Sequence, residues 1–450
     1  MKKNIENIVK IHFVGIGGIS MSALAMYYIK NGFLISGSDL VENNQIKILR
    51  QNGAKIAIGH AKKNVPIDTN FCVYTSAVSS FNSEVVFCKS KGIKTINRAD
   101  LLGEVFNGYK YNIAVSGSHG KTTTTALIYE TLRHSGLSPT LFLGGEYRND
   151  GNLHIGDGDF CVAEACEYKK SFLSFYPYIS VLLNAELDHT DCYKTSEDIF
   201  NAFSLFAQNT RQEGVAVINE KLTDKLNFKK NTVTFGFDES NTYYAKNLSS
   251  KNGVYSFDVF SSNINLGTIK LNIAGKHNIL NALAAYAVAK QFDLPHQTIA
   301  EGINCFKGVN RRFQAFECNF TNVIADYAHH PTEITATISA AHELGYQNIY
   351  VLFQPHTYTR TLSLMADFAC CFNGVKEVAV LPVYAAREKP IKGADHKSLA
   401  KRINENTSCI ALNSFGQASS YFKKRLNKND LLLVLGAGDI INFCAPKYLN

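Results

Sequence analysis

The run GSHGKTT, residues 117–123, decides the fold of the middle of this chain, because a glycine pair followed by Lys-Thr is typical of loops that hold a polyphosphate. An apolar run at residues 113–115 precedes it and residues 124–128 follow it, so the order is strand, loop, helix. Backbone amides of such a loop surround phosphate oxygens, while its lysine offers a charge and the next threonine a hydroxyl to Mg²⁺. We therefore predict an ATP site at Gly117, Ser118, His119, Gly120, Lys121, Thr122 and Thr123.

The loop is unusually short. Only Ser118 and His119 separate its glycines, fewer residues than in the common phosphate-binding loop. A surface turn before a helix is the alternative interpretation, and the flanking strand and helix favour the ATP loop.

Bulk properties describe an ordinary globular protein. A length of 450 residues is too great for one core and predicts about three domains. The net charge of +8 comes without long basic runs, so we expect anionic small substrates and no nucleic acid. The 11 cysteines show no metal-like spacing, which indicates reduced thiols in a cytoplasmic protein. Residues 11–29 carry no formal charge, but interrupting glycines favour a strand and helix over membrane insertion.

A second glycine-rich turn, at residues 15–18, follows the first predicted strand. A helix and a second strand at residues 33–36 complete a βαβ unit that ends near Asp39. Such a turn places a pyrophosphate at a helix N-terminus, and Asp39 has the spacing of a ribose-binding acid. Ser20 replaces the third glycine, so NAD, a nucleotide-sugar and no ligand at all are comparable interpretations.

Polar residues end two further strands of the middle segment, at Glu164 and Asn184. The carboxyl ends of parallel strands form the ligand crevice, so both side chains should point at the phosphates bound by the loop, and Glu164 is a candidate Mg²⁺ ligand. Residues 186–191 can hold a second cation or orient a carboxylate, although capping carboxylates in a surface turn are the alternative. Asn278 and Asn281 share one face at a helix start, where amides can read a base edge; helix capping by Asn278 explains that residue equally well.

The third segment repeats this pattern. Between residues 322 and 435, four strand-like stretches each end in polar residues or glycine. Each histidine near these ends, taken singly, is better explained as structural. Because several histidines and arginines would meet at one sheet edge, together they predict an anion site.

These motifs resemble the Mur ligases over essentially the whole chain. In chain order they are GIGGISMS, SGSD, GSHGKTT, EACEY, DHTD, GKHNILNALAA, RRF, DYAHHPTE, FQPHTYTR and LGAGD. The short loop is shared with folylpolyglutamate synthetases, but the first glycine turn and DYAHHPTE are similar to the muramate branch. The resemblance implies an α/β protein of three domains: a Rossmann-like UDP-sugar domain (1–107), a central P-loop ATPase domain with a mainly parallel sheet (108–308) and a Rossmann-like amino-acid domain (309–450).

The resemblance also implies roles for individual residues. A UDP-sugar rather than NAD would contact Gly15, Gly17, Gly18, Ser38, Asp39 and Ser76. One Mg²⁺ would be bound by Thr122 and Glu164, and a second by His189. ATP would also contact His277, Asn278 and Asn281 at the adenine, and Arg312 and Asp326 from the third domain. Tyr327 would line the amino-acid site, and the implied catalytic residues are Lys121, His189, His329, His356 and Arg360.

Two departures from the family pattern bear on the site. Many relatives carry arginine at the position of Thr357, which leaves more of the substrate carboxylate's charge to Arg360. No lysine lies between Lys194 and Lys221, so the carbamoylated lysine of relatives that act on later precursors is expected to be absent.

The implied reaction joins L-alanine to the lactyl carboxylate of UDP-N-acetylmuramate through an acyl phosphate, with ATP and two Mg²⁺ sites, in peptidoglycan precursor synthesis. One alternative is a murein peptide ligase that attaches a tripeptide to the same UDP-sugar. The other, from a different class, is an NAD-dependent oxidoreductase. We expect a monomer or weak homodimer whose third domain closes on the central one when nucleotide binds.

Overall fold

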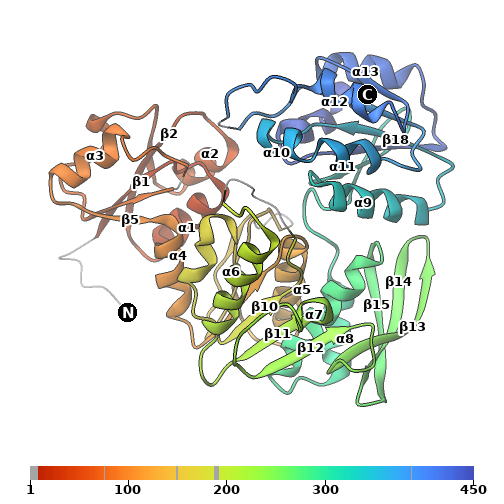
Figure 1. Ribbon diagram of the computed structural model, residues 1–450. Coiled ribbons are helices and arrows are strands. Elements are labelled where there is room, and N and C mark those ends of the chain that lie inside the picture. Colours follow the sequence, from red (N-terminus) through yellow and green to blue (C-terminus); the bar gives the residue numbers. More distant parts are fainter. Residues whose placement is uncertain (1–8, 76, 148–150, 187–191, 387) are drawn as a thin grey trace. The chain divides into compact units, whose positions relative to one another are not determined.

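Three sheets organise the chain. The computed structural model describes residues 9–75, 77–147, 151–186, 192–386 and 388–450 (Figure 1). Two compact units divide the chain: unit 1 contains residues 1–186, 195–234 and 284–294, and unit 2 contains residues 187–194, 235–283 and 295–450. None of the helices in the described ranges has both the length and the apolar character needed to traverse a bilayer.

The first sheet of unit 1 carries the amino-terminal glycine turn. Its elements are β1 (Lys10–Val14), α1 (Ile19–Lys30), β2 (Leu34–Asp39), α2 (Asn44–Gln51), β3 (Lys55–Ile58), η1 (Lys62–Asn64), β4 (Phe71–Tyr74), α3 (Ser83–Ser90), β5 (Lys94–Asn97) and α4 (Arg98–Asn107). The strands are parallel in the order β3-β2-β1-β4-β5. Residues 11–14 of β1 are all buried, as expected for a strand covered on both faces. The turn after β1 lies where the strand order reverses, which is where such sheets bind ligands.

The second sheet of unit 1 surrounds the phosphate-binding loop (residues 117–123). Its elements are β6 (Tyr111–Ser116), α5 (Lys121–His134), β7 (Thr140–Phe142), β8 (Leu153–His154), β9 (Phe160–Glu164), η2 (Tyr168–Ser174), β10 (Ile179–Leu182), α6 (Ser196–Gln208), β11 (Val215–Asn219) and η3 (Glu220–Leu222). These strands follow the order β11-β10-β6-β9-β7-β8 within a sheet of ten strands. β6 pairs in parallel with β9 and β10, so the carboxyl ends of these strands meet at one edge.

Unit 2 contains an antiparallel meander of three strands, β13 (Tyr243–Lys251), β14 (Val254–Ser261) and β15 (Ile264–Ala274). Next to the meander in the sequence are β12 (Thr232–Gly236, whose last two residues belong to unit 2), α7 (His277–Lys290, whose first half belongs to unit 2) and α8 (His296–Cys305). β13 and β15 flank β14, and Phe235 at the end of β12 pairs in parallel with Tyr243.

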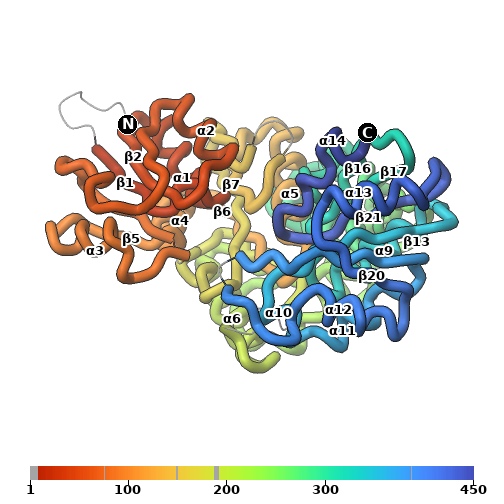
Figure 2. Tube along the Cα trace, turned by 90° about the horizontal axis from the view of Figure 1, so that it is seen from above, coloured from red at the N-terminus to blue at the C-terminus, as the bar shows by residue number. Residues whose placement is uncertain are grey.

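The third sheet forms the carboxyl-terminal part of unit 2. Its elements are β16 (Gln314–Phe316), β17 (Asn322–Asp326), α9 (Pro331–Glu343), β18 (Asn348–Phe353), α10 (Tyr358–Ser363), α11 (Met365–Cys370), β19 (Glu377–Val380), α12 (His396–Ile403), β20 (Cys409–Ala411), α13 (Phe415–Lys423), β21 (Asp430–Leu435), η4 (Asp439–Cys444) and α14 (Pro446–Leu449). The order is β16-β17-β21-β18-β19-β20, parallel except for β16. Figure 2 follows the Cα trace of this part of the chain, with β16, β17, β20 and β21 labelled.

Alternation along β18 places the third sheet between two cores. Ile349, Val351 and Phe353 belong to one apolar cluster, with residues from α9, α11 and α12. Tyr350 and Leu352 belong to the other, with residues from α13 and η4. Side chains of a strand alternate between its faces, so both faces of this parallel sheet are covered.

Candidate active site

The phosphate-binding loop has a backbone that glycine permits. Gly120 has φ +83° and precedes the first residue of α5. Gly117 has φ +157°, and a Cβ there would lie 3.0 Å from the Cβ of Leu183. A side chain at either position would therefore strain the turn that delivers the chain into the start of α5, where free amides favour anions.

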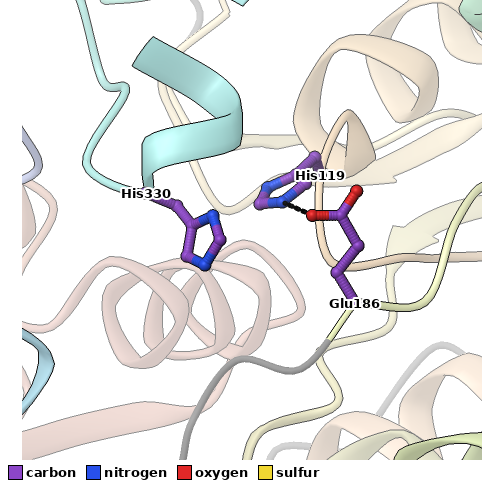
Figure 3. A group of neighbouring side chains, drawn as sticks. All are labelled: His119, Glu186 and His330. Atoms are coloured by element: carbon purple, nitrogen blue, oxygen red, sulfur yellow. Dashed lines mark hydrogen bonds and ion pairs between the residues drawn. The ribbon is translucent and has the colours of Figure 1, made fainter. Parts of the chain in front are cut away.

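The segment that follows β10 holds the loop from the neighbouring strand. The Asn184 side chain accepts the His119 amide at 2.8 Å and donates to the His119 carbonyl at 3.0 Å. The Glu186 amide donates to the Ser118 hydroxyl at 2.8 Å. Figure 3 shows the His119 ring beside the Glu186 carboxylate, with Nε2 and Oε2 3.3 Å apart. The loop is thus pre-shaped by protein contacts.

Lys121, the first residue of α5, is held at the loop by a buried carboxylate. Its Nζ donates to the Gly117 carbonyl, to the Ser118 carbonyl at 3.1 Å and to Glu167, whose Oε2 lies 3.0 Å away. The Glu167 side chain is 1 % exposed. Burial lowers the pKa of Lys121, but the charge and hydrogen bond of Glu167, together with the nearby Cys166 and Glu164, outweigh burial, and the net pKa is raised. Lys121 is therefore cationic at neutral pH.

Hard oxygen donors suited to Mg²⁺ occur at the same sheet edge. Glu164 ends β9, and its neighbour in the sheet is Val115, two residues before the loop. Its Oε1 accepts the Gly144 amide at 2.7 Å. Thr122 is buried in the first turn of α5, followed by Thr123. A carboxylate and a hydroxyl fit a hard cation. His189, the predicted ligand of a second Mg²⁺, lies outside the described residues.

In the glycine-rich turn after β1, backbone amides donate hydrogen bonds to other groups of the protein. The Gly15 amide, where φ is +83°, donates to the Ser38 carbonyl at 2.8 Å. The Gly17 amide, which the sequence led us to expect at a pyrophosphate, donates to Asp39 Oδ2 at 2.8 Å. Gly18 is the N-cap of α1. Asp39 and Ser38 therefore shape the turn, and their contact with a nucleotide stays a prediction; Ser76 lies outside the described residues.

A buried polar network lies behind Ser38. Its hydroxyl donates to Glu84 Oε2 at 2.5 Å, and His12 Nε2 lies 3.2 Å from the same oxygen. The Ala61 amide and the Asn64 side chain donate to Oε1 at 2.9 and 2.7 Å. Glu84 is 0 % exposed. Burial raises the pKa of Glu84, but the hydrogen bonds outweigh burial and hold that pKa at about 2.

Glu84→Gln is expected to destabilise the protein at neutral pH and to matter less in acid. The pKa in the folded state, about 2, lies below the ordinary value of 4.5, so the stabilisation is present above pH 4.5 and is lost as pH falls towards 2. The shift corresponds to about 3 kcal/mol. Thermal unfolding midpoints from about pH 7 to about pH 3 should show a shrinking gap between wild type and variant. A gap that stays constant would contradict this role.

Two asparagines at the amino end of α7 are hydrogen-bonded to each other. Asn281 donates to the Asn278 side-chain oxygen at 2.9 Å, and Asn278 donates to the Ala274 carbonyl at 2.7 Å. Both asparagines are buried, whereas His277 beside them is exposed. The structure thus places the pair on one face of the helix start, and their contact with an adenine remains a prediction.

Asp326, at the end of β17, is used to hold a strained turn. Its two carboxylate oxygens accept the Phe313 and Ala328 amides at 2.7 and 2.8 Å. Phe313 has φ +51°. Burial raises the pKa of Asp326 against the lowering charge of Arg312, whose guanidinium lies 4.8 Å from the centre of the Tyr327 ring. The predicted ATP contacts of Arg312 and Asp326 stay predictions.

The predicted catalytic histidines of unit 2, His329 and His356, lie next to groups of opposite charge. His329 Nδ1 lies 3.2 Å from the Glu333 carboxylate. His356 Nδ1 lies 3.2 Å from Nη1 of Arg360, and the His356 ring is stacked on Tyr384 with centroids 5.7 Å apart. Burial, His329 and Arg360 together lower the pKa of His356 to about 3. The two rings meet edge to face at 5.8 Å, so the structure brings His329, His356 and Arg360 together within unit 2.

Comparisons with known proteins agree along the chain. Three family descriptions match it: "Mur ligase family, catalytic domain" at residues 10–110, "Mur ligase middle domain" at 115–289 and "Mur ligase, glutamate ligase domain" at 311–438. The chain belongs to the Mur ligase family. The family and the α/β fold of three Mur ligase domains predicted from the sequence are confirmed.

Individual relatives show which members of the family this chain is similar to along its length. A UDP-N-acetylmuramate–L-alanine ligase of Clostridium acetobutylicum is 44% identical over 439 residues, which are 96% of this chain and 95% of the relative. The solved UDP-N-acetylmuramate-alanine ligase MurC of Thermotoga maritima is 30% identical, with a TM-score of 0.82 and 97% of each chain covered. A murein peptide ligase of Psychrobacter arcticus is 21% identical with a TM-score of 0.73 and 97% of each chain covered, and it shares the fold.

Two carboxylates of the site escaped prediction. Glu167 lies in the quoted EACEY motif, three residues after Glu164, and this spacing was the available signal. Glu84 is far from the glycine turn in sequence, and no local pattern marks it. Asn184 was expected to face phosphate, whereas its side-chain amide is bonded to the backbone of His119.

Proposed function

We propose that this chain joins L-alanine to the lactyl carboxylate of UDP-N-acetylmuramate, with conversion of ATP to ADP and phosphate, as a step of peptidoglycan precursor synthesis. The observation that carries the proposal is the pre-shaped loop with its cationic Lys121, in a chain 44% identical along nearly its full length to a ligase of that name. Cytoplasmic location and a monomeric or weakly dimeric state stay predictions.

Chemistry requires ATP because a carboxylate does not react with an amine near neutral pH. Transfer of the γ-phosphoryl group to the lactyl carboxylate makes an acyl phosphate, and the amine of L-alanine then displaces phosphate to form the amide. Two anions must approach each other in the first step. Lys121 supplies positive charge at the loop, and the amino end of α5, which follows the loop, favours a bound anion.

Mg²⁺ is implied by the nucleotide chemistry, and the donor set fits it. The Glu164 carboxylate and the Thr122 hydroxyl would hold the ion. When bound, Mg²⁺ neutralises phosphate charge and polarises the transferred phosphoryl group. Within the protein, the Gly144 amide orients the Glu164 carboxylate through Oε1.

His329 is the better acceptor for the proton that the amine loses. The Glu333 carboxylate lies 3.2 Å from Nδ1 of His329 and can orient that ring. The Arg360 guanidinium, 3.2 Å from Nδ1 of His356, opposes a positive charge there. We assign Arg360 instead to the carboxylate of the amino acid, which a guanidinium can bind with two parallel hydrogen bonds.

His329→Gln is expected to slow turnover by about 10²-fold or more, the usual contribution of a general base. Since the pKa of His356 is about 3, that ring is neutral at working pH, and His356→Gln should leave the shape of the pH–rate profile unchanged from roughly pH 5 to pH 9. Steady-state rates across this range decide between the rings. An altered profile in the His356 variant alone would reverse the assignment.

Substrate assays separate the alternatives. L-alanine and an L-alanyl tripeptide, tested side by side with UDP-N-acetylmuramate and ATP, distinguish the proposed reaction from that of a murein peptide ligase. The full-length likeness to L-alanine ligases favours the former. The match of residues 10–110 to a Mur ligase domain disfavours an NAD-dependent oxidoreductase, and NADH binding would be required to revive it.

A further inference from the structure

We propose that Glu388 is a positioning residue for the amino-acid substrate: its carboxylate fixes the start of α10 so that Arg360, one turn into that helix, presents its guanidinium to the substrate carboxylate. This inference rests on the proposed function. It assigns to Glu388 a role in recognising one of the three substrates, the amino acid.

The carboxylate of Glu388 accepts hydrogen bonds from the segment after β18. Its Oε1 accepts the hydroxyl of Thr357 at 2.7 Å and also the hydroxyl of Thr359. Its Oε2 accepts the Thr359 amide at 2.8 Å. Charge-assisted hydrogen bonds of this kind are the stronger ones in proteins. Burial raises the pKa of Glu388, but these donors outweigh burial and the net pKa is lowered, so the group is ionised at neutral pH.

The first turn of α10 depends on this distant carboxylate. Thr357 is the N-cap residue of α10, yet its side chain makes no capping hydrogen bond to the helix. The Thr357 hydroxyl donates to Glu388 instead, and the same carboxylate accepts an amide of the first turn. Orphan amides at a helix start are ordinarily satisfied by the N-cap side chain. Here the partner comes from the segment that follows β19.

Arg360 lies directly on the turn that Glu388 fixes. Its Nη1 donates to the His356 carbonyl at 2.9 Å and lies 3.2 Å from His356 Nδ1. His356 is stacked on Tyr384, and the Tyr384 amide donates to the Pro355 carbonyl at 2.8 Å. Two residues of the segment after β19 therefore fix the surroundings of Arg360. Tyr384 stacks on His356, which contacts Arg360, and Glu388 binds the start of α10.

Loss of the Glu388 contacts should affect mainly the binding of the amino acid. An arginine that binds a carboxylate with two parallel hydrogen bonds requires a fixed orientation. A displacement of about 1 Å at such a site costs up to about 10²-fold in rate. Loss of the Glu388 carboxylate frees the start of α10 and should weaken binding of the amino acid more than binding of ATP or of the UDP-sugar.

The test compares steady-state constants of purified full-length variants for all three substrates. Glu388→Ala should raise KM for L-alanine about 10-fold or more, with KM for ATP and for UDP-N-acetylmuramate within about 2-fold of wild type. Glu388→Gln keeps the shape and one acceptor oxygen, so a smaller rise is expected. Thr357→Val should raise KM for L-alanine in the same sense, and Thr357→Ser should restore it. Glu405→Gln, which removes an exposed carboxylate paired with Arg402, is the matched control and should change nothing.

Two results overturn the inference. One is an unchanged KM for L-alanine in Glu388→Ala. The other is a parallel change in all three KM values with a lowered unfolding temperature, which would mark a general structural role. Failure of the proposed function is separate from both, because it would appear as a wild-type protein without phosphate release that depends on L-alanine.

Discussion

Lys121→Ala is expected to reduce ATP-dependent phosphate release by at least about 10²- to 10³-fold, the usual cost of losing one preorganised donor to a transition state. Lys121 is the cation that the structure places at the loop, bonded to two loop carbonyls and to Glu167. Without it, the approach of the γ-phosphate to the lactyl carboxylate loses its fixed positive charge. Initial rates of ADP formation with saturating substrates measure the effect.

Matched lysine variants sharpen that experiment. Lys110→Ala removes an exposed lysine just before the amino end of β6, the same strand that leads to the loop, and should leave the rate unchanged. Lys121→Arg keeps the charge in a larger group and should recover only part of the activity. Near-normal turnover by Lys121→Ala, with intact folding, would remove the ATP site from residues 117–123.

Glu167→Ala is expected to damage both stability and activity. Removing one partner of a buried ion pair costs about 3–5 kcal/mol. In wild type the pKa of Lys121 is raised, so the pair's stabilisation is present at neutral pH and is lost only as pH rises through that raised value. The variant lacks the charge and the hydrogen bond of Glu167, so burial weighs more heavily on Lys121 and its pKa falls. The alkaline side of the rate profile should then move to lower pH.

Unfolding midpoints and pH–rate profiles of Glu167→Ala and Glu167→Gln check this account. Glu167→Gln keeps an acceptor oxygen near Lys121 but removes the charge, so it should shift the alkaline side in the same direction. The double variant Lys121→Ala/Glu167→Ala should lose less stability than the sum of the single variants, because the two groups share one interaction. Strict additivity, or an alkaline side that does not move, would count against the pairing.

Local pattern was enough to predict the loop and its flanking elements. The glycines, the lysine and the apolar runs on both sides each constrain the backbone within a few residues, and α5 begins at Lys121 as the strand, loop and helix order requires. Strand-like stretches of the third segment are also confirmed as strands, since β18 and β21 are formed there and are buried on both faces. Short-range chemistry therefore accounts for most of the fold.

The sequence could not predict which groups within the site bond to one another. Sequence shows that Glu164, Glu167 and Asn184 carry suitable groups, but not which neighbour each one meets. Glu164 turns to the Gly144 amide, whereas Glu167, three residues later, turns to Lys121. Glu388 and Thr357 are 31 residues apart, and only the adjacency of β18 and β19 brings their segments together. Such pairings depend on the packing of whole sheets.

One measurement tests the central claim most directly: phosphate release by the purified protein with ATP, Mg²⁺ and UDP-N-acetylmuramate against a panel of amino acids and an L-alanyl tripeptide, with the product identified by mass. We predict release that requires the UDP-sugar and is fastest with L-alanine, and a product heavier by one alanyl residue. Release with the tripeptide alone, or turnover that does not need UDP-N-acetylmuramate, would contradict the account.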